Sequence, residues 1–139
     1  MVVLLDTNII LDVLQKREGL YDSSFNVFEK CAKGECSGFI APHSMPNIFY
    51  IMRKVGVDVS DIRILLSGVL NIVAVSNLDE DDVRSAIERE DFKDFEDCLQ
   101  DECAINIDAD YIITRNTSDF RTSTINAITP EQLLDKMKD

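Results

Sequence analysis

Hydrophobic positions along the chain fall into two patterns, short runs rich in β-branched residues and longer stretches with an apolar residue every three or four positions. The short runs predict strands and the longer stretches predict amphipathic helices. The strands are expected at residues 2–5, 39–41, 72–75, 111–114 and 125–128. Helices are expected near residues 8–15, 23–32, 46–54, 60–70, 79–88 and 92–106, with a last one from residue 130.

The order of these elements predicts the fold class. Strands that alternate with helices form crossover units, which place parallel strands side by side and helices on both faces. We therefore expect an α/β protein, a three-layer α/β/α sandwich around a mostly parallel five-stranded sheet, in a single domain over residues 1–139. The last helix carries a clear start signal, because Thr129, Pro130 and Gln132 have the order of a capping box with proline at the first helical position.

Carboxylates follow two of the predicted strands, in positions where an apolar run stops abruptly. Asp6 comes directly after strand 2–5, and Asp119 lies in the loop after strand 111–114. In open α/β sheets, ligand sites lie beyond the carboxyl ends of the strands. On helix 92–106, Asp94, Asp97 and Asp101 form a stripe, in which Asp97 is placed to point toward the sheet and the other two toward solvent. The sequence thus predicts that Asp6, Asp97 and Asp119 gather at one edge.

Gathered carboxylates favour a metal site of a particular kind. Like-charge repulsion raises their pKa values, and a divalent cation removes that repulsion. Oxygen ligands suit the hard ions Mg2+ and Mn2+, which can generate a hydroxide nucleophile and neutralise a phosphodiester transition state. Each acid taken alone has a simpler interpretation: Asp6 or Asn8 as a helix cap, Asp97 as an acid in a first turn, Asp119 in an Asx turn. Those interpretations leave the shared position of the three acids unexplained.

Composition narrows the other classes of function. Twenty-six acidic and 14 basic residues give a net charge of −12, opposite to the basic surface of a general nucleic-acid binder. The acids form a solvated surface, surround a cation or attract a basic partner, and composition does not separate these. No apolar run approaches the ~20 residues of a membrane helix, and no signal peptide is evident. We expect a cytoplasmic protein without membrane contacts.

The four cysteines and the one histidine give little support to other chemistry. In a cytoplasmic protein the cysteines are expected to be buried free thiols rather than disulfides. Both pairs have C-x4-C spacing, which on a helix turns the second side chain away from the first. With His43 as the only histidine, structural zinc or a histidine-based catalytic unit is weakly supported.

Three stretches, taken in order, resemble the motifs of the PIN domain family. VLLDTNIILDVL is similar to the family's first motif, a strand closed by Asp with a D-T-N turn. DFEDCLQDECA resembles the motif in which an Asp opens a helix, and DYIITRNTSDF resembles the strand with its T-R-N turn and D-F ending. The resemblance covers nearly the whole chain. It implies a ribonuclease in which Asp6, Asp97 and Asp119 coordinate Mg2+ or Mn2+ and activate water.

The resemblance also assigns supporting groups and shows one departure. Asn8, Thr114 and Asn116 would be polar groups at the same edge. The family usually has a Glu early in the helix after the second strand, and here Asn47 occupies that place. An Asn carbonyl still ligates a cation but brings no charge, so Glu96, which lies beside Asp97, is a candidate to compensate. Arg53 and Arg115, with Lys54, Lys93 and Arg121 as further residues, are candidates to line a path for RNA phosphates if they share the acidic edge. Scattered, solvated lysines and arginines are the commoner interpretation of these side chains.

The residues leave three functions from different classes open. The first is a metal-dependent ribonuclease, and the resemblance, which extends to VapC-type toxins, implies that it is the toxin of a toxin–antitoxin pair, with RNA as substrate and a small antitoxin as partner. The second is a catalytically weakened PIN-like module that binds RNA or a protein, for which Asn47 and the acidic balance speak. The third is a phosphatase of the haloacid dehalogenase type, although that family has a second Asp where Asn8 stands. A homodimer is an expectation by resemblance. Phe49 and Tyr50 are candidates for its interface, although aromatic residues on a helix more often belong to the core.

Overall fold

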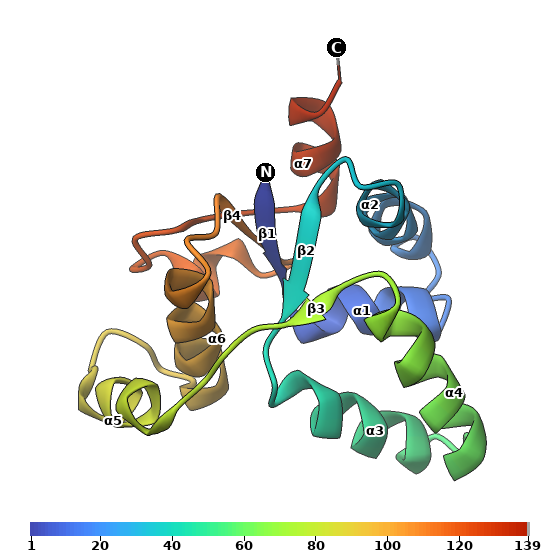
Figure 1. The fold of residues 1–139 in the computed structure, drawn as a ribbon, viewed down its shortest axis with the longest axis horizontal. Helices are drawn as coiled ribbons and strands as arrows, with labels where there is room; N and C mark the ends of the chain where they lie inside the picture. The colour runs from blue at the N-terminus through green and yellow to red at the C-terminus, as the bar shows by residue number, and fades with distance from the viewer. Residues whose placement is uncertain (139) are drawn as a thin grey trace.

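The computed structural model describes residues 1–138, so Asp139, the end of the range predicted as one domain, lies outside the described part. Its elements alternate along the chain as predicted (Figure 1). In order they are β1 (Val2–Leu5), α1 (Thr7–Leu14), α2 (Tyr21–Ala32), β2 (Ser37–Ile40), α3 (Ser44–Lys54), α4 (Val59–Leu70), β3 (Ala74–Val75), α5 (Glu80–Glu88), α6 (Phe95–Asn106), β4 (Tyr111–Ile113), the short 3-10 helix η1 (Thr117–Phe120), β5 (Asn126–Ile128) and α7 (Pro130–Lys136).

The strands form one parallel sheet in the order β3-β2-β1-β4-β5. β1 is central, and its register pairs Leu5 with Ile113 of β4. The next residues on these two strands, Asp6 and Thr114, therefore leave the sheet side by side. Backbone hydrogen bonds continue past the strand ends, because the Asp6 N–H donates to the Ile113 carbonyl at 2.9 Å. Crossover connections thus bring residues more than 100 positions apart to one edge of the sheet.

Alternate residues of β1 belong to cores on opposite faces of the sheet. Val3 and Leu5 pack in a cluster with residues of α1, α2, α3, α4 and α7, whereas Leu4 packs with Cys103 and Ala104 of α6. Figure 1 shows the same arrangement, with α6 on one side of the sheet and α5 outside it. Helices on both faces confirm the predicted α/β/α sandwich. The expected parallel five-stranded sheet is confirmed as well.

Local signals fixed some helix ends better than others. The predicted capping box is present in α7, where Thr129 accepts from the Gln132 N–H and Gln132 accepts from the Thr129 N–H. Asp79 makes the equivalent box with Asp82 at the start of α5. The cap expected for α4 at residue 60 or 61 was wrong, because that helix begins at Val59 after an extended Asp58.

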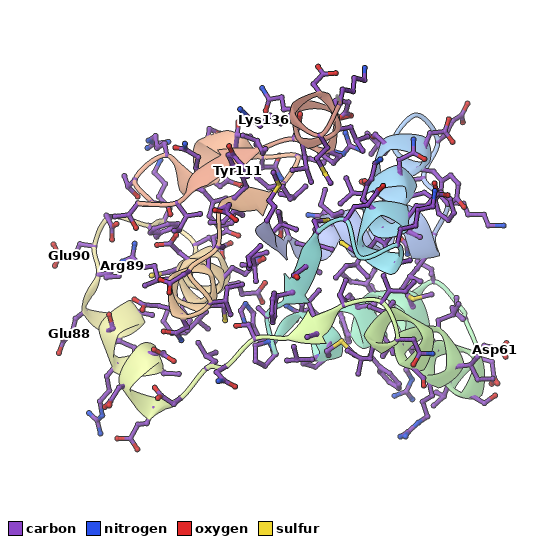
Figure 2. The ribbon with its side chains drawn as sticks, turned by 45° about the horizontal axis from the view of Figure 1, so that its top comes forward. Asp61, Glu88, Arg89, Glu90, Tyr111 and Lys136 are labelled. Atoms are coloured by element: carbon purple, nitrogen blue, oxygen red, sulfur yellow. The ribbon has the colours of Figure 1, made fainter. Side chains whose placement is uncertain are left out.

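The sequence interpretation of Asp101 as a solvent-facing residue was also wrong. Asp101 is fully buried, and its carboxylate lies 2.9 Å from Arg89 and accepts a hydrogen bond from Ser123. Arg89, which Figure 2 labels beside α6, also contacts Asp91 and Glu102. The segment after α5 therefore covers a helix face that periodicity alone assigned to solvent. Within residues 1–138, no helix has the length and apolar character needed to cross a membrane.

Candidate active site

A cleft of about 480 Å³ opens at the carboxyl edge of the sheet, where the sequence placed the acids. Its walls come from the first turn of α1, from α3, from the start of α6 and from the loop after β4. The lining residues are Asp6, Thr7, Asn8, Asn47, Tyr50, Ile51, Asp94, Glu96, Asp97, Gln100, Asn116 and Asp119. The three predicted acids thus share one cleft, together with four of the five predicted supporting groups.

Asp6 is held at the bottom of this cleft by two side chains from distant parts of the chain. Its exposed fraction is 5%, and its side chain makes no capping hydrogen bond to α1. Gln100 Nε2 donates to Asp6 Oδ1 at 3.0 Å, and Thr114 Oγ1 donates to Asp6 Oδ2 at 2.8 Å. Burial raises the pKa of Asp6, and the two hydrogen bonds oppose that rise. The capping interpretation of Asp6 is therefore not supported, since its carboxylate is aimed at α6 and β4.

The fifth predicted supporting group, Thr114, lies behind Asp6 as one link of a hydrogen-bond chain. Its hydroxyl accepts from the Asn116 N–H at 3.0 Å and donates to Asp6 at 2.8 Å. Because the backbone amide can only donate, the direction of the threonine hydroxyl proton is fixed toward Asp6. Thr114 is fully buried, so solvent does not compete for this proton.

Asp97 and Asp119 contribute two further carboxylates to the cleft lining. Asp97 lies in the first turn of α6, whose cap is Asp94 through hydrogen bonds from the N–H groups of Glu96 and Asp97. Burial raises the pKa of Asp97 to about 7, and the negative charges of Asp94, Asp6, Asp119 and Glu96 add to the rise. Asp119 lies in η1. The acids are close enough to repel one another electrostatically, which is the situation a cation relieves.

The carboxylates nevertheless do not stand in a finished coordination shell. Among residues 1–138, no three His, Cys, Asp or Glu side chains lie close enough together to hold a metal ion as they stand. Gln100 is a further residue of the cleft, one that the sequence pattern did not bring forward. It is 3% exposed, it lies one helical turn after Asp97, and its Oε1 is buried without a hydrogen-bond partner. Its spacing of three from Asp97 is the signal that places both on one side of α6.

His43, the residue before α3, contacts the start of α6. Its Nε2 lies 3.1 Å from the backbone carbonyl of Glu96, to which it donates, and its Nδ1 is buried without a hydrogen-bond partner. Burial lowers the pKa of His43, so the ring is neutral near neutral pH. The neighbouring Ser44 bonds to Thr7 at 2.7 Å rather than to the ring. The histidine therefore positions the start of α6, and no Ser-His pair is formed.

The structure places the two predicted phosphate-binding arginines away from the cleft lining. Arg115 donates from Nε to buried Asp12 at 3.2 Å, from Nη1 to Glu131 at 3.0 Å and from Nη2 to the Leu20 carbonyl at 2.9 Å. All three of its nitrogens are thus engaged within the protein, which argues against the predicted role in substrate binding. Arg53 lies in the last turn of α3 and is exposed, but it does not line the cleft.

Comparisons with known proteins agree with this geometry. The PIN domain family profile matches residues 2–118. A chain of the VapBC2 structure from Rickettsia felis, bound to a DNA fragment from their promoter, has a TM-score of 0.70 and 20% identity, covering 93% of this chain and 98% of that chain. A chain of a toxin–antitoxin complex from Klebsiella pneumoniae has a TM-score of 0.68 and 21% identity, covering 92% of this chain and 97% of that chain. A chain of VapBC-1 from nontypeable Haemophilus influenzae has a TM-score of 0.68 and 13% identity, covering 94% of this chain and 99% of that chain.

At these identities the structural likeness shows the fold, and no curated protein sequence matches the chain. The family profile carries the assignment because it spans most of the chain, including β1 with Asp6, the start of α6 and the loop after β4. The match to the PIN domain profile does not favour the alternative function, a phosphatase of the haloacid dehalogenase type. The chain belongs to the PIN domain family.

Proposed function

We propose that this protein is an endoribonuclease that depends on Mg2+ or Mn2+, and that it is the toxin of a toxin–antitoxin pair. The observation that carries the proposal is the shared cleft of Asp6, Asp97 and Asp119 at the carboxyl edge of a PIN-type sheet. The toxin role draws support from neighbours that are VapBC and toxin–antitoxin complexes. A small antitoxin, a second copy of the chain and a cytoplasmic location belong to the same proposal.

The residues of the cleft fit a hard divalent cation. All the candidate ligands are oxygens, from three carboxylates and from the amides of Asn47 and Gln100. Each oxygen of Asp6 accepts one side-chain hydrogen bond, which leaves lone-pair capacity for a cation. Asp97, with a pKa of about 7, exchanges its proton for the cation near neutral pH. Mg2+ or Mn2+ held there would supply a bound water of lowered pKa and a positive charge facing the phosphodiester.

The protein's own groups set the geometry for that chemistry. Gln100 and Thr114 keep the Asp6 carboxylate oriented, so it needs little rearrangement when substrate arrives. Asp97 and Asp119 line the same cleft and supply the remaining negative charge. Asn47 adds a neutral oxygen where a carboxylate would add a charge, which weakens the attraction for a cation.

Two basic side chains other than Arg53 and Arg115 are better placed to contact the RNA phosphates. Lys93 and Arg121 line a small cavity of about 60 Å³ that also touches Asp97 and Asp119. Positive charge beside the acids is needed because the chain as a whole, at −12, repels a polyanion. We therefore assign the phosphate contacts next to the reacting bond to Lys93 and Arg121.

The test is cleavage of single-stranded and of structured RNA in the presence of Mn2+, with wild type compared to Asp6→Asn. The variant should lose about 100-fold or more in rate, since removal of a metal ligand exceeds the 10- to 100-fold effect of an outer-shell change. Asp135→Asn is the matched control and should cleave RNA like wild type, because Asp135 in α7 is exposed and does not line the cleft. Equal activity in Asp6→Asn, or activity that survives EDTA, contradicts the proposal.

A catalytically weakened module is the second candidate, and two observations favour it. Asn47 lines the cleft in place of an acid, and the described carboxylates do not already form a three-ligand cluster. Isothermal titration with Mn2+ separates the candidates, because no binding up to millimolar metal supports the module that binds RNA or a protein partner. Asn47→Glu should raise Mn2+ affinity if this position faces the cation. An unchanged affinity would show that it does not.

A further inference from the structure

The two pairs of cysteines have the same sequence spacing but different geometry. Cys98 and Cys103 both lie within α6, where five positions rotate the second side chain by about 140° from the first. Cys31 lies in the last turn of α2, and that helix ends at Ala32, before Cys36. The Sγ atoms of Cys31 and Cys36 are 3.4 Å apart. The sequence-based expectation that C-x4-C spacing separates the thiols was therefore wrong for this pair.

The end of α2 explains why the chain returns to Cys31. Gly34 has φ of 75°, and its N–H donates to the Cys31 carbonyl at 3.0 Å. The Glu35 N–H donates to the Lys30 carbonyl, also at 3.0 Å. These two bonds make a Schellman motif, which reverses the chain direction at a helix end. The next residue, Cys36, is thereby directed back onto the last turn of the helix.

A glycine in the neighbouring strand leaves room for the sulfur. A Cβ at Gly38 would lie 2.8 Å from the Sγ of Cys31 and 2.9 Å from Cγ1 of Val73. The missing side chain of Gly38 thus lets Cys31 lie against β2, beside Cys36. A bond between the two sulfurs requires them to approach by about 1.4 Å, from 3.4 Å to about 2.05 Å. A movement of that size is of the order that rotation of the two side chains supplies.

We propose that Cys31 and Cys36 form a reversible intramolecular disulfide when the protein meets a peroxide. The exposed fractions are 7% and 5%, yet both residues line an open surface pocket of about 410 Å³ together with Gly34 and Gly38. A molecule as small as hydrogen peroxide reaches the sulfurs from this pocket. The inference is independent of the proposed ribonuclease function, because the pair lies at the amino end of β2 and the acids lie at the carboxyl edge.

Cys36 is the sulfur that reacts first. Hydrogen bonding with Cys31 lowers the pKa of Cys36, and the positive charges of the N-terminus and Lys30 act in the same direction, against burial and the charge of Glu35. The same contact and burial raise the pKa of Cys31, so this thiol keeps its proton. A thiolate is the nucleophile in thiol oxidation, so this asymmetry selects Cys36.

The reaction then balances in two steps. The Cys36 thiolate attacks one peroxide oxygen, so that an S–O bond forms, the O–O bond breaks and, after proton uptake, a sulfenic acid and one water result. The Cys31 sulfur attacks the Cys36 sulfur, the S–S bond forms, the S–O bond breaks, and the departing hydroxide takes the Cys31 proton as a second water. Two thiols and one hydrogen peroxide give one disulfide and two waters.

The experiment treats the full chain with stoichiometric hydrogen peroxide, blocks free thiols under denaturing conditions and measures mass. We expect a monomer with two of its four thiols lost, a mass lower by about 2 Da before blocking, and full reversal by dithiothreitol. Trypsin cleaves after Lys33, between the two cysteines, so the bond appears as one linked pair of peptides. The melting temperature should rise by about 5 °C on oxidation, as expected for closing a short loop in a chain of this size.

Two double variants serve as matched controls. Cys98→Ala/Cys103→Ala should oxidise like wild type, and Cys31→Ala/Cys36→Ala should keep its two remaining thiols under the same treatment. Should the first variant prove unstable, the peptide map of wild type decides alone. The proposal is overturned if wild type retains four thiols, if only linked dimers appear, or if the Cys98–Cys103 pair is consumed at the same rate.

Discussion

Replacement of Asp97 by Asn should stabilise the protein at alkaline pH, even though it removes a candidate metal ligand. Asp97 has a pKa of about 7 in the folded protein, against 3.8 for an ordinary aspartate. Between these pH values the folded state holds a proton that the unfolded state releases. Stability from this group is therefore fully present below pH 3.8 and is lost as pH rises to about 7. An asparagine at this position does not ionise and keeps that stability.

The size of the effect follows from the pKa values and from exposure. A pKa difference of one unit between the folded and unfolded states corresponds to about 1.4 kcal/mol of unfolding free energy. Between pH 5 and pH 8, stability is lost over the two units from pH 5 to the folded pKa of about 7, which amounts to roughly 2.7 kcal/mol. Asp97 is only half-buried, so solvent screening reduces this figure to about 1 kcal/mol. Burial is the largest cause of the shift, so the effect belongs to Asp97 itself and not to one neighbour.

The assay is urea unfolding followed by circular dichroism, in EDTA, at pH 5 and pH 8. The chain has no tryptophan, so a dichroism signal is preferable to fluorescence. The loss of unfolding free energy from pH 5 to pH 8 should be about 1 kcal/mol smaller in Asp97→Asn than in wild type. Glu18→Gln, at an exposed turn position, is the control and should follow wild type. A wild-type pH dependence in Asp97→Asn, or a lower stability than wild type at pH 8, would refute this account of Asp97.

The remaining predictions concern residues that hold the site and the fold. Gln100→Leu should weaken Mn2+ binding about tenfold in calorimetry with an unchanged dichroism spectrum, because Asp6 loses a donor that orients it, and unchanged affinity would remove Gln100 from the site. Asp12→Ala should lower the unfolding free energy by about 1–3 kcal/mol in urea, because Arg115 loses its buried acceptor although it keeps Glu131, and no loss would contradict this. Asp79→Ala should cost about 1 kcal/mol through loss of the α5 cap, measured in the same assay, and no loss would show that the cap is dispensable.

The sequence predicted the fold because each local signal agreed with the topology. The position of Asp6 after a buried run was sufficient to place it at the carboxyl edge, since parallel strands all end there. The T-P-x-Q pattern at Thr129 located the start of α7 to the residue. Strand ends were less certain, as the predicted strand 72–75 contains only two paired residues, Ala74 and Val75. An edge strand has one pairing partner, so its pattern carries less information.

What the sequence did not reveal depended on contacts between distant segments. Periodicity places Asp101 and Gln100 on sides of α6, but it does not say what packs against those sides. Arg89 covers Asp101, and the carboxylate of Asp6 meets Gln100 from 94 residues away. The thiols near residue 31 were misjudged for a related reason, since helical spacing was applied past the end of a helix.

Two fully buried aspartates, Asp12 and Asp101, hold segments that border the cleft. Each of them forms an ion pair with an arginine of such a segment. Arg115, the residue after Thr114, pairs with Asp12. Arg89 pairs with Asp101 and lies at the start of the segment that leads to Asp97. A buried carboxylate without its partner is very unfavourable, so each pair fixes the segment that carries its arginine. The loops that position the outer acids are therefore held by ion pairs whose carboxylates are fully buried. The carboxylates of the cleft repel one another. They stay close together at one edge because the two buried ion pairs, Arg115–Asp12 and Arg89–Asp101, hold the segments that carry them.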